Sequence, residues 1–373
     1  MGRTVNNPLL AERPWFEALT PEMPLLVSEA TDVAFATRAR QELADKKQRH
    51  FQRVEHVQDK AIMSLWNSEC PWPSPSRSRF LLKVAFNTVC QRYHILHMSS
   101  TRESLEQMIR EPAACDTTST CKLSALFALG ELFSSRTCVS DAQFPGLDYY
   151  VSSTRMLQAI SEHPNIHCVE VLTMLVRYLD AWTIHANRTK SIYSLAMNRR
   201  HSSYCYVGCA VRFAIITGLH LNVPPHCMPD PILRETRKRI WWTVYILDRS
   251  WASMLGKPVT IQDDDIDVDL PAELPPRTES DIDDFANTDY CIANLRIANL
   301  SAQISASIYR RRRQTGNFLS RVQHALQSLD AWLQELPNTL RAAVSQASVD
   351  SAAHIITLHL SFNQVRVPSP SNI

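Results

Sequence analysis

Apolar residues recur at intervals of three or four along most of the chain, the spacing that places side chains on one face of a helix. In the clearest case, the apolar residues between Val207 and Ile215 form a stripe that can face a core. The pattern therefore predicts a protein built from helices. We expect helices at about 32–52, 80–93, 123–133, 154–161, 167–184, 204–218, 233–255, 288–313 and 319–336, with a last one from about 351 onward.

The segment from 258 to 276 breaks this pattern. Pro258, Pro271, Pro275 and Pro276 bracket it, and its apolar and acidic residues alternate in part. Alternation between flanking prolines suits an extended chain better than a helix. We therefore expect an extended connection between two helices here.

Glycine is scarce: the chain of 373 residues has 7, where usual usage would give ~26. No two of them are closer than ten residues, so neither common glycine-rich phosphate loop can be written. Tight hairpin turns usually need glycine at positive φ, which disfavours β-sandwiches and barrels. With 45% apolar residues, the composition favours an all-α fold of many helices with irregular, proline-rich connections.

The charge balance is nearly even, with 39 Lys and Arg against 37 Asp and Glu. A protein that binds nucleic acid unaided usually has a marked basic excess, because phosphate contacts supply most of its affinity. The most apolar window, residues 205–221, is interrupted by Arg212 and His220, so we expect no membrane span. The first thirty residues lack the apolar core of a secretory signal.

The ten cysteines contain no C-x-x-C pair and no cluster that could form a zinc ribbon or finger. In a chain for which no export signal is expected, this pattern indicates reduced thiols, most of them buried. We therefore expect the protein inside the cell.

An acidic run offers candidate metal chemistry. Asp263, Asp264 and Asp267 fit D-D-x-x-D, the magnesium–diphosphate motif of all-α terpene synthases. The flanking prolines argue against the helix that this motif needs, and no second metal-binding motif follows. A calcium loop fails as well, because Val268 and Leu274 stand where glycine and glutamate are required. A solvated acidic loop and a surface for a basic partner remain as interpretations.

Two further clusters have alternative interpretations. His94 and His97 form H-x-x-H on a predicted helix, a spacing that could hold a metal, although core or surface histidines explain it as well. Arg310–Arg313 could serve nuclear import or contact phosphate, and could equally oppose the helix dipole at a C-terminus.

Three consecutive stretches carry more specific motifs. GCAVRFA at 208–214 is followed by Gly218-Leu219-His220. ETRKRIWW at 235–242 is followed by Tyr245, Asp248 and Arg249. LGKP at 255–258 is followed by IQDDDIDVDLP at 261–271.

In this order and spacing, the three stretches resemble the fungal-specific transcription factor domain, also called the middle homology region. The resemblance covers about 80–364 and is strongest over 203–271. It rests on Gly208, Ala210, Arg212, Gly218, Leu219, His220, Arg239, Trp241, Trp242, Asp248, Arg249, Gly256, Pro258, Asp263, Asp267 and Pro271.

The resemblance implies an all-α regulatory domain with no catalytic residue and no cofactor. The family acts in the nucleus on transcription by RNA polymerase II. Its implied roles are to restrain activation, respond to a small-molecule inducer, and contact the transcriptional machinery or related transcription factors. DNA binding and zinc binding belong to the binuclear-cluster module that usually precedes this domain.

The chain departs from the family in two places. Residues 1–79 form a proline-containing linker with one predicted helix, and Cys70 is the only cysteine there, so the six-cysteine zinc cluster is missing. We therefore expect no zinc in this chain and no base reading by it alone. Residues 354–364 resemble a family helix, but the non-homologous tail 365–373 cannot continue it, so we expect a C-terminal truncation.

Physical roles can be assigned to the matched residues. Trp241 and Trp242 should point about 100° apart and anchor two neighbouring helices. Asp248 and Arg249 should cap a helix or form an ion pair in the core. Gly208 lies inside a predicted helix, where it costs about 1 kcal/mol relative to alanine, so we expect a close helix contact there. Gly218 should end a helix, and Gly256 should open the turn into the aspartate segment.

The sequence is compatible with three functions. The favoured one is a regulatory domain that acts through protein contacts. The alternative is a Mg²⁺-dependent, terpene synthase-like enzyme that uses Asp263, Asp264 and Asp267. The third is a sensor whose small-molecule ligand lies in a pocket between helices.

Overall fold

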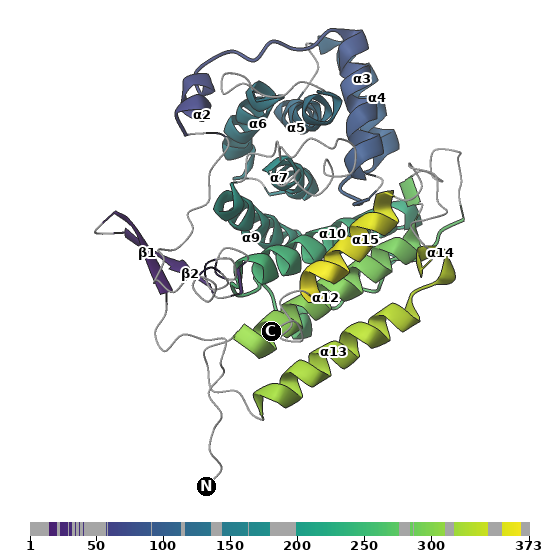
Figure 1. Ribbon diagram of the computed structural model, residues 1–373. Coiled ribbons are helices and arrows are strands. Elements are labelled where there is room, and N and C mark those ends of the chain that lie inside the picture. The colour runs from purple at the N-terminus through teal and green to yellow at the C-terminus, as the bar shows by residue number, and fades with distance from the viewer. Residues whose placement is uncertain are drawn as a thin grey trace. The chain divides into compact units, whose positions relative to one another are not determined.

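The fold is all-α, as predicted, with one short β-hairpin added (Figure 1). The computed structural model describes residues 15–20, 23–28, 30–31, 34, 37, 40, 57, 59–90, 92–112, 116–135, 144–162, 164–179, 199–275, 284–285, 287–309, 317–341 and 353–366. Contacts divide the chain into two units. We call residues 55–245 and 260–292 the helical unit, and residues 1–54, 246–259 and 293–373 the hairpin unit.

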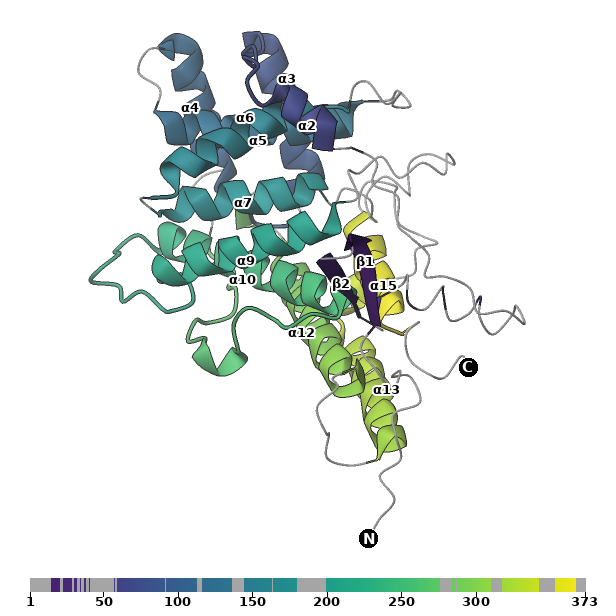
Figure 2. The same cartoon turned by 90° about the vertical axis from the view of Figure 1, so that its left-hand side faces the viewer.

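The helical unit is built around α5, which is buried along most of its length. Its elements are α2 (Asp59–Leu65), α3 (Pro75–Ala85) with a π-helical turn at Phe86–Cys90, α4 (Met98–Arg110), α5 (Thr117–Ser134), α6 (Leu147–Ile160), α7 (Ile166–Leu179), α9 (Arg200–Ile216) and the first part of α10 (Pro231–Leu255). Helices α3, α6 and α7 pack on α5, and α7 lies between α5 and α9 (Figure 2). Every residue from Cys121 to Gly130 is buried, because neighbours surround this helix.

The hairpin unit contains the strands β1 (Trp15–Thr20) and β2 (Met23–Val27), which pair antiparallel. It also contains the rest of α10 and most of α12 (Thr288–Tyr309), with α13 (Phe318–Glu335), α14 (Asn338–Arg341) and α15 (Ala353–Arg366). Trp332 of α13 stacks on Phe362 of α15 with ring centroids 5.5 Å apart. Its indole Nε1 donates to the Ala293 carbonyl at 3.2 Å, which fastens α13 to α12.

Helix starts follow local capping chemistry. Ser74 caps α3 by accepting a hydrogen bond from the Arg77 amide, and Pro75 occupies the first helical position. Asp116 caps α5 through the Ser119 amide at 3.3 Å. In both places a side-chain oxygen satisfies a backbone donor that has no partner within the helix.

Most of the expected helices are present, with shifted ends. Residues 34, 37 and 40 of the helix expected at 32–52 are helical, and its other residues lie outside the described part of the chain, as do 310–313. The segment 258–275 is extended as predicted, except for a single 3-10 turn at Asp263–Asp265.

Other expectations were wrong. Helices α2 and α4 and the hairpin were not predicted, because short or polar segments lack a long apolar stripe. His94 does not lie on a helix, and His97 is the residue that caps α4. Helix α15 continues through Val365 and Arg366, where the sequence predicted a non-helical tail.

Close helix contact occurs at Gly130 rather than at Gly208. A Cβ at Gly130 would lie 2.5 Å from the Leu81 carbonyl oxygen and 2.8 Å from its Cα, so α3 and α5 approach closely only because this residue has no side chain. A Cβ at Gly208 would meet the Arg212 Nη1 at 3.2 Å, and Arg212 is exposed and free to move aside. The expected role of Gly208 in packing was therefore wrong.

Alanine substitutions should separate the two glycines. Gly130→Ala forces the backbones of α3 and α5 apart and should cost about 1–3 kcal/mol of unfolding free energy. Gly208→Ala should leave stability unchanged or raise it by up to about 1 kcal/mol, since alanine is the better helix former. Thermal unfolding of the two variants checks this, and an equal loss in both would contradict it.

Candidate functional site

The extended segment after α10 is fastened to the loop that follows α9. The Asp267 amide donates to the His220 carbonyl at 3.0 Å, and the Asn222 amide donates to the Asp267 carbonyl at 2.8 Å. These bonds form a parallel bridge between Leu221 and Asp267. The Asn222 side chain also accepts from the Asp269 amide at 3.2 Å, so the segment is held through its backbone.

Two aromatic residues of α10 hold the same segment. The Trp242 Nε1 donates to the Asp269 carbonyl at 2.8 Å, and the Tyr245 hydroxyl donates to the Asp263 carboxylate at 2.8 Å. Trp241 is fully buried beside the His220 ring, with centroids 5.8 Å apart. The hydrogen bond of Trp242 and the ring contact of Trp241 are with residues outside helices, while Trp242 also meets Tyr245 of its own helix with ring centroids 5.2 Å apart. That the two tryptophans anchor neighbouring helices stays a prediction.

A buried ion pair lies at the centre of this arrangement. Arg239 is 2% exposed, and its Nε donates to the Glu235 carboxylate at 2.9 Å, one turn away on α10. Its other nitrogens donate to the carbonyls of Ala272 at 3.0 Å and Phe285 at 3.1 Å, and to the Thr288 hydroxyl at 2.7 Å. One guanidinium thus joins α10, the extended segment and the first turn of α12.

Glu235 completes the cluster. Its Oε1 also accepts from the Ala272 amide at 2.9 Å, and its Oε2 lies 3.2 Å from the Lys238 ammonium. Both buried charges therefore have several polar partners, which a desolvated ion pair needs if it is not to destabilise the fold.

A second polar cluster lies at the start of α4. Asp284 accepts from the Met98 amide at 2.7 Å and from the Ser99 hydroxyl at 2.6 Å, so it caps α4 from 186 residues away in sequence. The His97 Nε2 lies 3.5 Å from the same carboxylate. The His94 ring stacks on Phe285 at 5.5 Å, and its Nδ1 contacts the Asp284 carbonyl oxygen at 2.9 Å.

The His94 imidazole is held in its neutral form. Burial and the nearby Arg239 guanidinium lower its pKa from 6.5 to about 4, although Asp284 opposes this shift. The Arg239 guanidinium also lies 5.2 Å from the centre of the Phe285 ring. Phe285 therefore contacts both the His94 imidazole and the Arg239 guanidinium.

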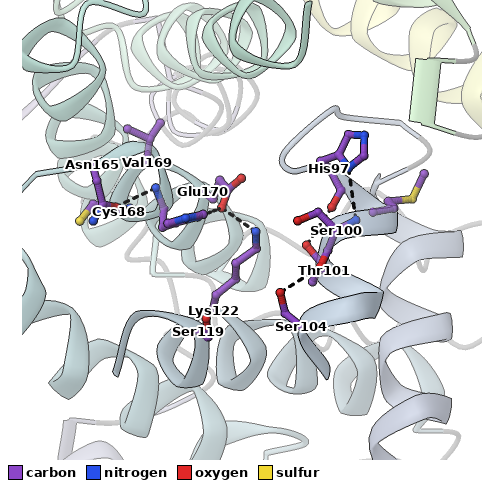
Figure 3. Close-up of polar contacts among 12 residues, drawn as sticks. His97, Ser100, Thr101, Ser104, Ser119, Lys122, Asn165, Cys168, Val169 and Glu170 are labelled. Atoms are coloured by element: carbon purple, nitrogen blue, oxygen red, sulfur yellow. Dashed lines mark hydrogen bonds and ion pairs between the residues drawn. The ribbon is translucent and has the colours of Figure 1, made fainter. Parts of the chain in front are cut away.

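A third ionic contact joins α5 to α7. The Lys122 ammonium lies 2.8 Å from the Glu170 carboxylate, and the His167 Nδ1 lies 2.8 Å from the same oxygen. Figure 3 shows Lys122 and Glu170 pointing toward one another. Burial would raise the pKa of Glu170, but Lys122 and His167 outweigh it and hold that pKa below its ordinary value.

The remaining matched residues have structural positions. Ala210 is buried in α9, and Leu219 is buried just after it. Gly218 has a φ of 66° and ends α9, where its amide and that of Leu219 bond back to Ile215 and Ala214. Pro271 is buried and Pro258 is exposed.

Four matched positions belong to the hairpin unit: Asp248, Arg249, Gly256 and Pro258. Asp248 and Arg249 are buried and form the expected ion pair at 2.8 Å. Gly256 has a φ of 57° and opens the turn after α10, as expected. A Cβ there would collide with the Ser28 side chain, so this position requires glycine twice over, for backbone conformation and for space.

The aspartates lack the geometry of a magnesium site. Asp263, Asp264 and Asp267 are exposed and lie on a 3-10 turn and at an isolated β-bridge rather than on one face of a helix. Across the described ranges, no group of three or more His, Cys, Asp or Glu residues could hold a metal ion. Nor is any described helix long and apolar enough to cross a membrane.

The matched motifs thus lie on α9, on α10 and on the extended segment that hydrogen-bonds to α10 and to the loop after α9. Comparison with known families matches residues 82–342, well over half of the chain, to the fungal specific transcription factor domain. The chain belongs to this family. The family is not enzymatic, which leaves the terpene synthase-like alternative without support.

The curated relatives of this family member are transcriptional regulators. One is an uncharacterized transcriptional regulatory protein of Schizosaccharomyces pombe, 25% identical over 71% of this chain and 32% of its own length. Another is the activator of stress genes 1 of Saccharomyces cerevisiae, 25% identical over 65% of this chain and 25% of its own length.

A third relative is an ABC-transporter-regulating transcription factor of Aspergillus oryzae, 24% identical over 52% of this chain and 22% of its own length. The chain thus spans about a third or less of the length of these relatives. No solved structure matches it significantly.

Sequence reasoning named Arg239 and missed its partners. The spacing of Glu235 and Arg239, four residues apart on a predicted helix, was an available signal for an ion pair. Nothing local marks Asp284, Phe285 or His94, because the contacts of these residues span long stretches of chain.

Removal of the Arg239 charge should destabilise the fold strongly. Arg239→Gln strands Glu235 in the interior and removes bonds to two other segments, for an expected loss of about 3–5 kcal/mol in unfolding free energy. Urea unfolding measures this. The matched control is Arg296→Gln, which breaks an exposed pair with Glu335 at 3.3 Å and should cost less than about 1 kcal/mol. Equal losses would show that the buried cluster has no special role.

His94 should make stability depend on pH in acid. The folded protein binds a proton at His94 only near pH 4, whereas the unfolded chain does so near 6.5, so unfolding takes up a proton between these values. Stability should therefore fall as the pH drops from about 6.5 to about 4. His94→Asn should reduce that slope by about one proton in urea unfolding across this range. An unchanged slope would contradict the assignment.

Proposed function

We propose that this chain is the regulatory unit of a fungal transcription factor and acts in the nucleus on genes transcribed by RNA polymerase II. In this proposal it works through contacts with the transcriptional machinery or with related transcription factors, and it responds to a small-molecule inducer. Residues 80–364 form the regulatory domain. Recognition of DNA sequence is supplied by a separate zinc-cluster module or partner, since residues 1–79 have no such motif.

The match over residues 82–342 carries the proposal. The geometry supports it, because polar groups at several matched positions are engaged within the fold. The Arg239 and Glu235 charges are used within the fold, and Trp242 bonds a backbone carbonyl. A binding or scaffolding role fits side chains used in this way better than catalysis does.

The exposed aspartates offer a contact surface of fixed shape. The side chains of Asp263, Asp264, Asp265, Asp267 and Asp269 are exposed while the backbone between them is clipped to α10 and to the loop after α9. Two relatives are named for stress genes and for ABC-transporter regulation, so genes of these classes are the first targets to test.

A tethering experiment tests the regulatory role. The full chain, fused to an unrelated DNA-binding domain, should change expression of a yeast reporter that carries the matching operator. The change can be an increase or a decrease, because the family both activates and restrains. A reporter level equal to that of the DNA-binding domain alone would contradict the proposal.

A gel-shift titration of the unfused chain tests whether sequence recognition of DNA needs a separate module or partner. At physiological salt it should show no specific complex at nanomolar concentration, because specific sites are usually bound with a Kd of about 10⁻⁸–10⁻¹¹ M. Specific nanomolar binding would show that the chain reads DNA by itself.

A further inference from the structure

A cavity of about 330 Å³ lies in the helical unit between the loop after α9, the first turns of α10 and the extended segment. Ligand pockets in proteins usually measure roughly 300–1,000 Å³, so this one suits a small molecule. One wall is apolar and includes Leu219, Leu221, Val223 and Val268. Leu221 is 45% exposed, which leaves apolar surface for a ligand to cover.

The other wall is cationic. Arg234, Arg237 and Lys238 line it from the first turns of α10. Lys238 shares Glu235 with Arg239, and Arg234 donates to the Met228 carbonyl. Asp269 is the acidic residue that lines the cavity. Three cations thus face one carboxylate.

Arg234 and Arg237 have no carboxylate partner among the described residues, and Arg237 is the one of them with a buried nitrogen left unpaired. Its Nη2 donates to the Thr217 carbonyl at 2.8 Å, whereas its buried Nε makes no hydrogen bond to any described residue. No carboxylate in the described ranges pairs with it. Burial lowers the pKa of its guanidinium, which is the effect of a desolvated charge without a counterion. A bound anion would supply that counterion.

We propose that this cavity binds a small organic anion, a carboxylate or phosphate monoester with a short apolar chain. The head group pairs with Arg237 and Lys238, and the chain covers Leu221 and Val268. The inference rests on the proposed function, in which this anion is the regulating ligand. Binding would join the loop, α10 and the extended segment and would stabilise the helical unit by mass action.

The surroundings favour a small molecule over an acidic peptide. A peptide longer than the cavity would extend over the exposed side chains of Asp263–Asp265, Asp267 and Asp269, which would repel its charge. A small anion fits within the cationic wall and avoids them.

Calorimetric titration of the full chain with four probes tests the proposal. Hexanoate or hexyl phosphate should bind, and the one that binds identifies the head group. Hexanol lacks the charge and inorganic phosphate lacks the chain, so each should bind at least about tenfold more weakly. Equal binding of hexanol, equal binding of inorganic phosphate, or no binding of either hexyl anion would overturn the proposal.

Variants locate the site. Arg237→Gln should weaken binding of the hexyl anion about tenfold, and Leu221→Trp should block the cavity without changing its charge. Arg110→Gln, an exposed change on α4, should leave binding unchanged. Circular dichroism confirms that each variant is folded. Equal affinity in Arg237→Gln and Arg110→Gln would overturn the site, as would tighter binding of an acidic peptide than of the hexyl anion.

The reporter assay separates this inference from the proposed function. Suppose that the hexyl anion changes reporter expression through the unsubstituted chain. If the tethered Arg237→Gln chain still regulates the reporter but no longer responds to that anion, the pocket and the proposed function are both supported. If the unsubstituted chain regulates while the calorimetry shows no anion binding, the pocket fails and the function stands. If the anion binds but the tethered chain has no effect, the regulatory role fails and the pocket is a binding site only.

Discussion

The arrangement of α10, the extended segment and the start of α12 depends on a buried guanidinium. Taking a charge out of water costs several kcal/mol unless polar partners replace the lost solvent. At 2% exposure Arg239 has no solvent to rely on, so Glu235 and acceptors from two other segments must be in place. This requirement favours the observed docking of those segments, because it supplies acceptors for the Nε and for both terminal nitrogens of the planar fork.

The extended segment shows how this constraint divides backbone from side chains. Its carbonyls and amides face inward, toward Trp242, Asn222 and the Arg239–Glu235 pair. Its aspartate side chains remain exposed. The run of carboxylates resembles a metal site in the sequence, but in the structure it is the exposed edge of a segment held mainly by its peptide groups. The Asp263 carboxylate adds one side-chain contact, since it accepts from the Tyr245 hydroxyl.

Periodicity predicted the helices whose apolar stripes are long, such as α9, α10 and α13, and prolines predicted the extended segment. Periodicity did not predict α4, because polar residues interrupt its apolar positions. The carboxylate that caps its N-terminus comes from Asp284, far away in the sequence. Arg239 could be named from its motif, whereas its partners Ala272, Phe285 and Thr288 lie 33 to 49 residues away and leave no local pattern. Gly208 shows the opposite error, a motif position given a packing role that Gly130 fills instead.

The cap that Asp284 places on α4 has a consequence for synthesis. A ribosome makes Met98 and Ser99 long before the carboxylate that receives their hydrogen bonds, since 186 and 185 residues separate the partners. The nascent chain must hold α4 with unsatisfied amides, or leave it unformed, until residue 284 emerges. Completion of the helical unit is therefore coupled to translation beyond the extended segment, as far as residue 284, and a contact of such long range delays folding further.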